Sequence, residues 1–469
     1  MKKPNVIYIL ADDMGYGDVS ALNERCGFHT PSLDELCKEG MSFLDAHSTS
    51  AVCTPSRYSI LTGEYCWRSM LKRDVLQGYD KPIIENGTST IAGFLKCQGY
   101  RTACIGKWHL GMEWPLSDPH DKYSVDFTKT IADGPIAKGF DYFYGISASL
   151  DMPPYVYIEN DHVTALPDRI ESNEWDRGNS YNKQMFRKGP VGRDFHHEEV
   201  LDRILQKAMD WLEQWKDEPF FLYFPLTAPH GPILPTAEFE GRSGTTEYGD
   251  FVLMCDAIVG KINHWLKQHH LEEDTILIFT SDNGGAPRAN YSELAQYGHN
   301  PSYIYRGGKF DIFEGGHRIP LIVKWKNQIL PGTVSKKMTS LVDLYATLAD
   351  ILGVPLEAGE AKDSVSAYPL WKGEEDYERK YMIFHSVNGS FSIRNDKWKL
   401  IMCPDSGGKS NPVPGDVPSH FPDRQLYSME QDVRERKNVI ADHPEIEQEL
   451  MKVLIECVAG DSEINNVTD

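Results

Sequence analysis

The sequence predicts an α/β fold, in which helices flank a large, doubly wound, mostly parallel sheet, together with a smaller C-terminal α+β domain that contains an antiparallel sheet. Three observations predict it. Short apolar runs lead directly into polar loops, amphipathic helical patterns lie between these runs, and the pattern changes after about Gly373. With 469 residues, 41% of them hydrophobic, the chain has enough apolar material for more than one domain.

Four apolar runs are predicted to be buried strands, each followed at once by a polar loop. They cover residues 6–10, 100–105, 220–224 and 275–280. Because these runs do not alternate with polar residues, both faces of the sheet are expected to be covered, as in parallel sheets. Ligands of such sheets bind outside the carboxyl ends of the strands, so the polar loops are predicted to converge there.

Helical periodicity is found at 32–39, 89–98, 200–215 and 249–268. Residues 114–199 break the alternation of strands and helices, and we interpret them as an insertion over the active edge that shapes substrate preference. Residues 381–386, 390–394 and 398–403 are predicted to form an antiparallel meander, and 444–458 a closing helix. The predicted domains are therefore 1–373 and 374–469.

Charge and cysteine content exclude several classes of protein. The chain has 48 Lys and Arg against 69 Asp and Glu, a net charge of −21, which disfavours nucleic acids and anionic membranes as partners. An anionic ligand must therefore be held in a locally basic pocket. Nine cysteines without a C-x-x-C pair argue against a disulfide framework or structural zinc.

Targeting signals and membrane spans are not recognisable in the sequence. The longest apolar runs fall short of the roughly 18 residues that a membrane helix needs. The apolar stretch 6–11 near the N-terminus is too short for a signal peptide and ends in acidic residues. As written, the chain is expected to be cytoplasmic, or periplasmic or secreted if a leader has been removed.

Two pairs of Asp and Asn residues follow predicted strands that are far apart in the sequence. Asp12 and Asp13 follow the first strand, and Asp282 and Asn283 follow the run at 275–280. Three carboxylates and an amide form an oxygen-only set suited to Ca²⁺ or Mg²⁺ rather than zinc. The alternative is that both pairs are ordinary turn or cap residues, for which Asp and Asn are also favoured.

The segment 53–63, CTPSRYSILTG, carries the sharpest signal. Pro55 suits the first turn of a helix and Gly63 its end, so Cys53 is predicted at a helix N-terminus, where free N–H groups favour an anion. Arg57 lies one turn further along and can reach back. The alternative is a capped helix with a buried thiol and a surface arginine.

The pattern C-x-P-S-R-x-x-x-L-T-G resembles the signature of the type I sulfatases, within the alkaline phosphatase superfamily. Other blocks resemble this family in the same order along the chain. They are 12–13 (DD), 106–109 (GKWH), 229–232 (PHGP), 281–284 (SDNG), 308–309 (GK) and 314–320 (EGGHRIP). The resemblance covers nearly the whole of the main domain and extends to the C-terminal region.

The resemblance implies that Cys53 is oxidised by a formylglycine-generating or anaerobic maturation enzyme to Cα-formylglycine, which hydrates to a geminal diol. One hydroxyl would attack sulfur and release the alcohol, and the second would then expel sulfate. Ca²⁺, or less favourably Mg²⁺, would be held by position 53 and by four further side chains: Asp12, Asp13, Asp282 and Asn283. Asp282 would also help to deprotonate the diol.

The remaining roles implied by the resemblance concern charge and protons. Arg57 would position the formylglycine, Lys107 and Lys309 would bind the sulfate oxygens, His230 would protonate the leaving oxygen with help from Lys309, and His109 would take a proton during elimination. Lys107 and His109 are expected on one side of an extended segment. His299 is a further candidate for substrate binding, with an ordinary loop histidine as the alternative.

Three basic side chains and four aromatic ones are interpreted less specifically. Arg306 and His317 lie near Lys309 in sequence, and His317 with Arg318 would brace the Gly-rich turn. Aromatic residues of the insertion are candidates to stack on a sugar ring, with ordinary packing as the alternative. These are Tyr155, Tyr157, Trp175 and Tyr181.

The predicted function is a sulfuric ester hydrolase acting on a sulfated carbohydrate, with a galactose sulfate or an N-acetylhexosamine sulfate as the expected substrate. One alternative is a phosphonate or phosphate monoester hydrolase, because enzymes of that kind share the metal loops. A second is a non-catalytic binder of sulfated glycans, which would follow if Cys53 stays unmodified. The sequence predicts no particular oligomeric state.

Overall fold

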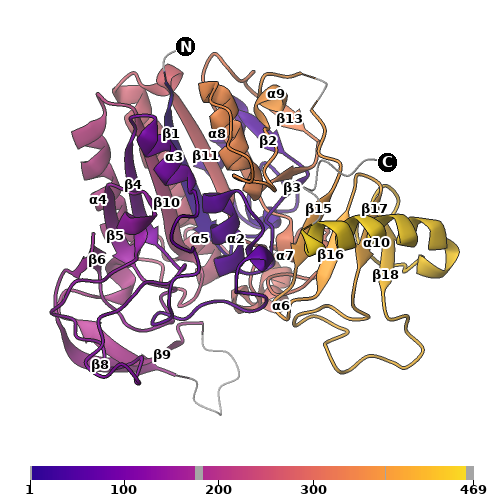
Figure 1. Ribbon diagram of the computed structural model, residues 1–469, viewed down its shortest axis with the longest axis horizontal. Coiled ribbons are helices and arrows are strands. Elements are labelled where there is room, and N and C mark those ends of the chain that lie inside the picture. Colours follow the sequence, from indigo (N-terminus) through magenta and orange to yellow (C-terminus); the bar gives the residue numbers. More distant parts are fainter. Residues whose placement is uncertain (1–2, 175–182, 375–376, 461–469) are drawn as a thin grey trace.

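The computed structural model describes residues 3–174, 183–374 and 377–460. A ten-stranded sheet runs through the main body, in the order β13-β2-β12-β11-β1-β10-β4-β5-β6-β7 (Figure 1). Its five central strands, β11, β1, β10, β4 and β5, are all parallel to one another, whereas β12 is antiparallel to β11. The predicted doubly wound, mostly parallel sheet is confirmed.

The strands of this sheet include all four predicted apolar runs. Three of them are buried along their whole length, and β4 is exposed only at its first residue. Their bounds are β1 Asn5–Asp12, β2 Met41–Phe43, β4 Arg101–Lys107, β5 Tyr142–Ile146, β6 Ile158–Glu159, β7 His162–Val163, β10 Phe220–Pro229, β11 Thr275–Ser281, β12 Leu321–Lys324 and β13 Thr333–Ser335.

Helices cover both faces of the sheet and form two separate hydrophobic cores. One core receives side chains of α1, α4 and α5, and the other receives side chains of α2, α3 and α8. The α-helices are α1 Pro31–Glu39, α2 Cys53–Thr62, α3 Ile91–Cys97, α4 Val200–Trp215, α5 Glu247–Gln268, α6 Tyr291–Leu294, α7 Glu314–His317, α8 Leu344–Leu352, α9 Tyr368–Trp371 and α10 Pro444–Ala459.

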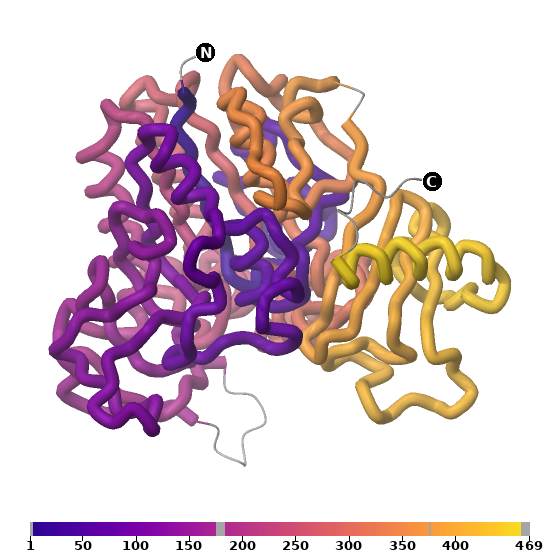
Figure 2. Tube along the Cα trace, viewed as in Figure 1, coloured from indigo at the N-terminus to yellow at the C-terminus, as the bar shows by residue number. Residues whose placement is uncertain are grey.

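The C-terminal part forms its own four-stranded antiparallel sheet in the order β15-β16-β17-β18, with α10 packed against β16 and β17. In Figure 2 it is the yellow and light-orange region beside the main body. The predicted meander is confirmed, and a fourth strand completes it. The bounds are β15 Met382–His385, β16 Phe391–Arg394, β17 Trp398–Ile401 and β18 Gln425–Ser428.

The segment 114–199 is more closely integrated than the sequence indicates. Strand β5 lies inside it and pairs in parallel with β4, from Ala103–Tyr142 to Lys107–Ile146, so this part belongs to the central sheet. The same segment also forms a separate hairpin of β8 Pro167–Asn173 and β9 Phe186–Gly192. A further small sheet pairs β3 Ala46–His47 with β14 Thr339–Ser340.

Buried ion pairs connect the main body to the C-terminal sheet. Glu314, fully buried on α7, accepts hydrogen bonds from Arg394 on β16 at 2.9 Å and from Lys399 on β17 at 3.2 Å. The His317 ring contacts Lys399 Nζ at 2.9 Å, and Arg306 donates to the Glu435 carbonyl at 2.9 Å. His317 and Arg306 therefore hold the two parts together, and neither lines the cavity described below.

Gly63 ends α2 in the left-handed conformation, with φ at 69°, and a Cβ there would overlap the side chain of Ala361. Gly63→Ala is expected to lower the free energy of unfolding by about 2–4 kcal/mol, since backbone strain and overpacking add.

Gly353→Ala is the matched control. Gly353 ends α8 with φ at 65° and has no atom within 4 Å of such a Cβ, so a loss of about 1 kcal/mol is expected. Equal losses in urea unfolding would contradict the packing argument.

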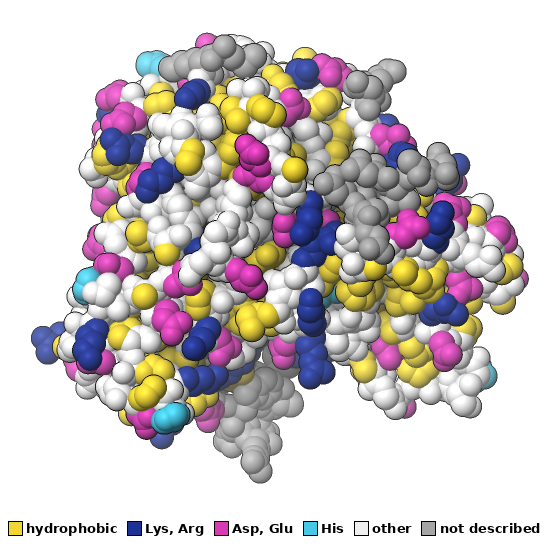
Figure 3. Space-filling model, in the orientation of Figure 1, with side chains coloured by type: hydrophobic (Ala, Val, Ile, Leu, Met, Phe, Trp, Pro, Cys, Tyr) yellow, Lys and Arg dark blue, Asp and Glu magenta, His cyan; other side chains and the backbone are white. Residues whose placement is uncertain are grey.

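Three further findings concern the thiols, the helices and the surface. All nine cysteines lie in described residues and are free, in agreement with the predicted lack of a disulfide framework. In the described part of the chain, every helix is either too short or too polar to cross a bilayer. Acidic and basic side chains are interspersed over the face shown in Figure 3, where a row of Lys and Arg follows the junction of the main body with the C-terminal part.

Candidate active site

The loops after β1 and β11 bring the two predicted pairs of Asp and Asn residues together. Asp12 is the last residue of β1, and Asp282 follows the neighbouring parallel strand β11. The Asp13 amide donates to Asp282 Oδ1 at 3.2 Å, and Asn283 Nδ2 donates to Asp13 Oδ1 at 2.8 Å. All four residues are almost fully buried. Parallel pairing thus gathers, at one sheet edge, side chains that are about 270 positions apart.

Three buried cations contact these carboxylates. Arg57 on α2 donates to Asp282 Oδ2 from Nε at 2.9 Å and from Nη2 at 2.7 Å, and lies 3.4 Å from Asp12 Oδ1. Lys107, at the end of β4, reaches both Asp12 oxygens at 2.9 and 2.7 Å. Lys309 lies 2.6 Å from Asp13 Oδ1. Three positive and three negative charges therefore balance in a buried space.

Burial and neighbouring charges together shift the pKa values of these carboxyl groups in different directions. Burial favours the neutral acid, but the positive charge of Lys107 overcomes this effect and holds the pKa of Asp12 well below its ordinary value. In the same way, Lys309 outweighs burial and lowers the pKa of Asp13. For Asp282, burial prevails over Arg57 and raises the pKa to about 6.

The residues present fit a hard divalent cation. Ligand atoms of Asp12, Asp13, Cys53 and His230 lie within 4.8 Å of one another. Asn283 Oδ1 is buried without a hydrogen-bond partner, as expected for an amide oxygen reserved for a cation. Asp282 is not part of this group of four, and its two oxygens accept hydrogen bonds from the Asp13 amide and from Arg57. The sequence did not indicate that His230 lies this close to the carboxylates.

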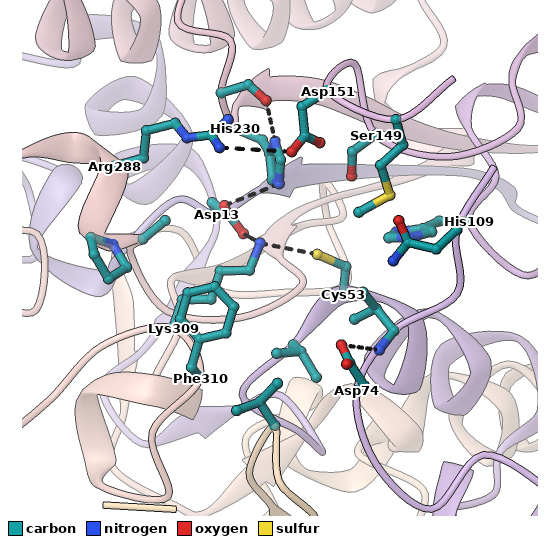
Figure 4. A pocket seen from close by; sticks show the side chains of 18 of the residues that line it. Asp13, Cys53, Asp74, His109, Ser149, Asp151, His230, Arg288, Lys309 and Phe310 are labelled. Carbon is teal, nitrogen blue, oxygen red and sulfur yellow. Dashed lines mark hydrogen bonds and ion pairs between the residues drawn. The ribbon is translucent and has the colours of Figure 1, made fainter. Parts of the chain in front are cut away.

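Cys53 is the first residue of α2, as predicted, and the helix N-terminus has no side-chain cap. The Cys53 side chain is 2% exposed and accepts a hydrogen bond from Lys309 Nζ at 3.2 Å (Figure 4). Burial raises the pKa of the Cys53 thiol to about 12, although Lys107 and Lys309 oppose the shift. At neutral pH the unmodified side chain is therefore a protonated thiol, which is a poor nucleophile and a poor ligand for a hard cation.

His109 lines the cavity and has one buried ring nitrogen without a partner. Its Nε2 lies 2.8 Å from the Leu76 carbonyl, to which it must donate, and this leaves Nδ1 buried without a partner. Burial, together with the charge of Lys107, holds the pKa of His109 well below its ordinary value. His109 also has a left-handed backbone, with φ at 59°. The expected extended geometry from Lys107 to His109 is therefore wrong, and only His109 lines the cavity.

His230 follows β10 and faces Asp13, with Nε2 3.6 Å from Asp13 Oδ2 and Nδ1 2.5 Å from the Gly231 carbonyl. Burial, with the nearby charge of Lys309, lowers the pKa of His230. The neutral ring then exposes an accepting Nε2. Donation of a proton from this atom requires an anion close by, because a negative charge favours the imidazolium form.

A cavity of about 650 Å³ opens over Cys53. Asp13, His109, His230 and Lys309 line it, as the sequence analysis expects of site residues. Seven further polar residues in its wall were not predicted. They are Asp74, Gln77, Ser149, Asp151, Arg187, Arg288 and Lys409. Ser149 and Asp151 follow β5, and recognition of 142–146 as a strand of the central sheet would have indicated them.

Other predicted substrate contacts lie elsewhere. Both ring nitrogens of His299 are engaged, Nε2 with Asp18 at 2.8 Å and Nδ1 with the Gly27 amide at 3.2 Å, and His299 does not line the cavity. The interpretation of His299 as a substrate ligand is corrected accordingly. Tyr155 and Tyr157 are buried against Phe195 rather than free to stack on a sugar. Trp175 and Tyr181 lie outside the described residues.

Comparison with known proteins assigns the class. The model of the sulfatase family matches residues 4–354, so the chain belongs to the sulfatase family and is a sulfatase. This agrees with the resemblance carried by the segment 53–63 and by the strand-end motifs.

Similar individual proteins include an N-acetylgalactosamine-6-O-sulfatase of Bacteroides thetaiotaomicron, 34% identical over 97% of this chain and 93% of the relative. An N-acetylgalactosamine-6-sulfatase of Canis lupus familiaris is 31% identical over 80% of this chain and 67% of the relative. A solved structure from work on glycosaminoglycan metabolism by B. thetaiotaomicron matches with a TM-score of 0.84. It is 32% identical and covers 98% of this chain and 100% of its own.

Proposed function

We propose that the enzyme removes the 6-sulfate of N-acetylgalactosamine in a sulfated carbohydrate, using Ca²⁺ and a formylglycine derived from Cys53. The substrate rests on the names of two relatives that cover most of this chain. The chemistry rests on one observation: Cys53 Sγ and carboxylate oxygens of Asp12 and Asp13 lie within 4.8 Å of one another, and Cys53 and Asp13 line the cavity. The roles of the other residues of the site are described relative to this group of side chains.

The oxygen ligands and the basic side chains have complementary tasks. A bound Ca²⁺ supplies a Lewis acid that polarises the sulfate ester and favours an oxygen nucleophile at position 53. Because the cluster of side chains is neutral overall, the cation makes the centre positive and attractive to an anion. Lys309, with Nζ at 3.2 Å from Cys53 Sγ, is placed to stabilise charge on the sulfate oxygens.

Proton transfers are assigned to the two histidines. His109 lines the cavity and its Nδ1 has no partner, so we assign to this nitrogen the proton released from position 53. His230 donates a proton to the leaving sugar oxygen, since the bound anionic ester favours its protonated form. Arg57, on α2, donates two hydrogen bonds to Asp282 and thereby orients the first turn of α2.

Maturation of Cys53 needs a separate partner. The conversion removes the thiol sulfur and leaves an aldehyde oxygen, a change that the protonated, buried thiol does not undergo alone. We assign this step to a formylglycine-generating enzyme or its anaerobic counterpart. Without it, the same cavity would bind sulfated glycans but not turn them over.

A panel of defined esters tests the substrate assignment. The highest kcat/KM is expected for N-acetylgalactosamine 6-sulfate, above galactose 6-sulfate, N-acetylgalactosamine 4-sulfate and N-acetylglucosamine 6-sulfate. Release of sulfate and of free sugar should be measured in parallel. Preference for another sugar sulfate would contradict the substrate, and faster turnover of an aryl phosphonate than of an aryl sulfate would favour a phosphonate monoester hydrolase.

A further inference from the structure

Two buried polar atoms in the cavity wall have no hydrogen-bond partner and no task in the chemistry above. They are Ser149 Oγ and Asp151 Oδ1. Ser149 is 2% exposed and Asp151 is 4% exposed, and both line the same cavity as Cys53. A buried polar atom without a partner is costly, and a carboxylate oxygen especially so. Figure 4 shows both side chains on the His230 side of the cavity, opposite Phe310.

The loop that carries these residues is part of the same sheet edge as the rest of the site. It follows β5, which pairs in parallel with β4, the strand that ends at Lys107. Two arginines lie on one side of the Asp151 carboxylate. Oδ2 is 3.7 Å from Arg288 Nη2 and 4.0 Å from Arg187 Nη2. Arg187 is held in turn by Gln77 Oε1 at 2.5 Å. The two arginines therefore engage Oδ2 of Asp151 and leave Oδ1 for a ligand.

The hydrogen-bonding properties of Ser149 Oγ and Asp151 Oδ1 determine which substrate group can bind to both. A carboxylate oxygen only accepts, and a serine hydroxyl both donates and accepts. A sugar hydroxyl satisfies both, because it can donate to Asp151 while it accepts from Ser149. An acetamido group could meet these needs only with two separate atoms, its N–H and its carbonyl oxygen, whereas a hydroxyl meets both with one oxygen. A second sulfate or a carboxylate would be repelled by Asp151.

The geometry points to Asp151 and Ser149 as the pair that recognises a free hydroxyl on the sugar ring bearing the scissile sulfate. Sugars in which that hydroxyl is itself sulfated are rejected. This inference rests on the proposed function, since it assumes a sugar sulfate in the cavity. It identifies the side chains by which the enzyme would distinguish its sugar substrate from a simple aryl sulfate.

Two substrates and three variants test the inference. On N-acetylgalactosamine 6-sulfate, Asp151→Asn should lower kcat/KM by about 10²-fold and Ser149→Ala by about tenfold. On 4-nitrophenyl sulfate, which has no ring hydroxyl, both should stay within about threefold of wild type. Asp217→Asn is the matched control, because Asp217 is exposed and precedes β10 at the end opposite His230. It should change neither rate, and thermal unfolding should show that every variant is folded.

Analogues of the sugar give a second, independent readout. Among the 3-deoxy and 4-deoxy forms of the 6-sulfate, wild type should discriminate by about 10²-fold against one, and Asp151→Asn should not discriminate against it. Equal losses on the sugar and aryl substrates, or no discrimination by wild type, would overturn the inference while leaving the proposed function intact. Turnover of the aryl sulfate but of no sugar sulfate would overturn both.

Discussion

Cys53→Ala is expected to reduce sulfate-ester turnover by at least about 10⁴-fold, because the variant can neither be matured nor supply a nucleophile. Binding should survive, since Lys309, His230 and the strand-end carboxylates are unchanged. The measurement is kcat on 4-nitrophenyl sulfate, with the affinity for a sugar sulfate determined separately by calorimetry.

The control for this variant uses another buried thiol. Cys104 is fully buried in β4 and does not line the cavity, so Cys104→Ala tests loss of a buried sulfur without loss of the nucleophile. It should keep turnover within about threefold of wild type while lowering thermal stability. Residual turnover by Cys53→Ala near the wild-type level would show that another group attacks sulfur.

Lys309→Met should slow the chemical step by about 10²–10³-fold, as for the loss of a donor to a developing oxyanion. The ammonium group of Lys309 bridges Asp13, at 2.6 Å, and Cys53, at 3.2 Å. It therefore contacts both the cation site and the nucleophile. Methionine keeps most of the side-chain volume, so the loss reports charge rather than packing. Single-turnover rates at saturating aryl sulfate measure the step.

Lys326→Met provides the comparison for charge alone. Lys326 is half exposed and pairs with Glu272 at 3.3 Å, away from the cavity. Its substitution removes one positive charge from the same acidic protein and should leave the rate unchanged. A comparable effect of the two substitutions would mean that Lys309 acts through the overall charge and not through contact with the sulfate.

The sequence predicted the features that neighbouring residues mark, and it missed those that depend on residues distant in the sequence. Asp12, Asp282 and Lys107 each follow an apolar run, so local pattern and the rule for parallel strands together placed them at one edge. Strand β5 was missed because its five residues, YFYGI, lie within an irregular, polar stretch. Ser149 and Asp151, which follow it, were missed with it.

Other errors concern partners that are distant in the sequence. His299 is engaged by Asp18, 281 positions away, and no periodicity indicates such a pair. Lys409 enters the cavity wall from the C-terminal part, which depends on how the two parts pack. The left-handed backbone of His109 is likewise set by its surroundings, since its side chain bonds the Leu76 carbonyl and its own carbonyl accepts from Thr54.

The chemical identity of side chain 53 tests the central claim most directly. Trypsin should release residues 39–57 as one peptide, and its mass reports the side chain in the purified, active enzyme. The account predicts a peptide that has lost one sulfur and two hydrogens, has gained one oxygen, and reacts with a hydrazide. An intact thiol at position 53, fully alkylated in a preparation that turns over sulfate esters, would contradict it.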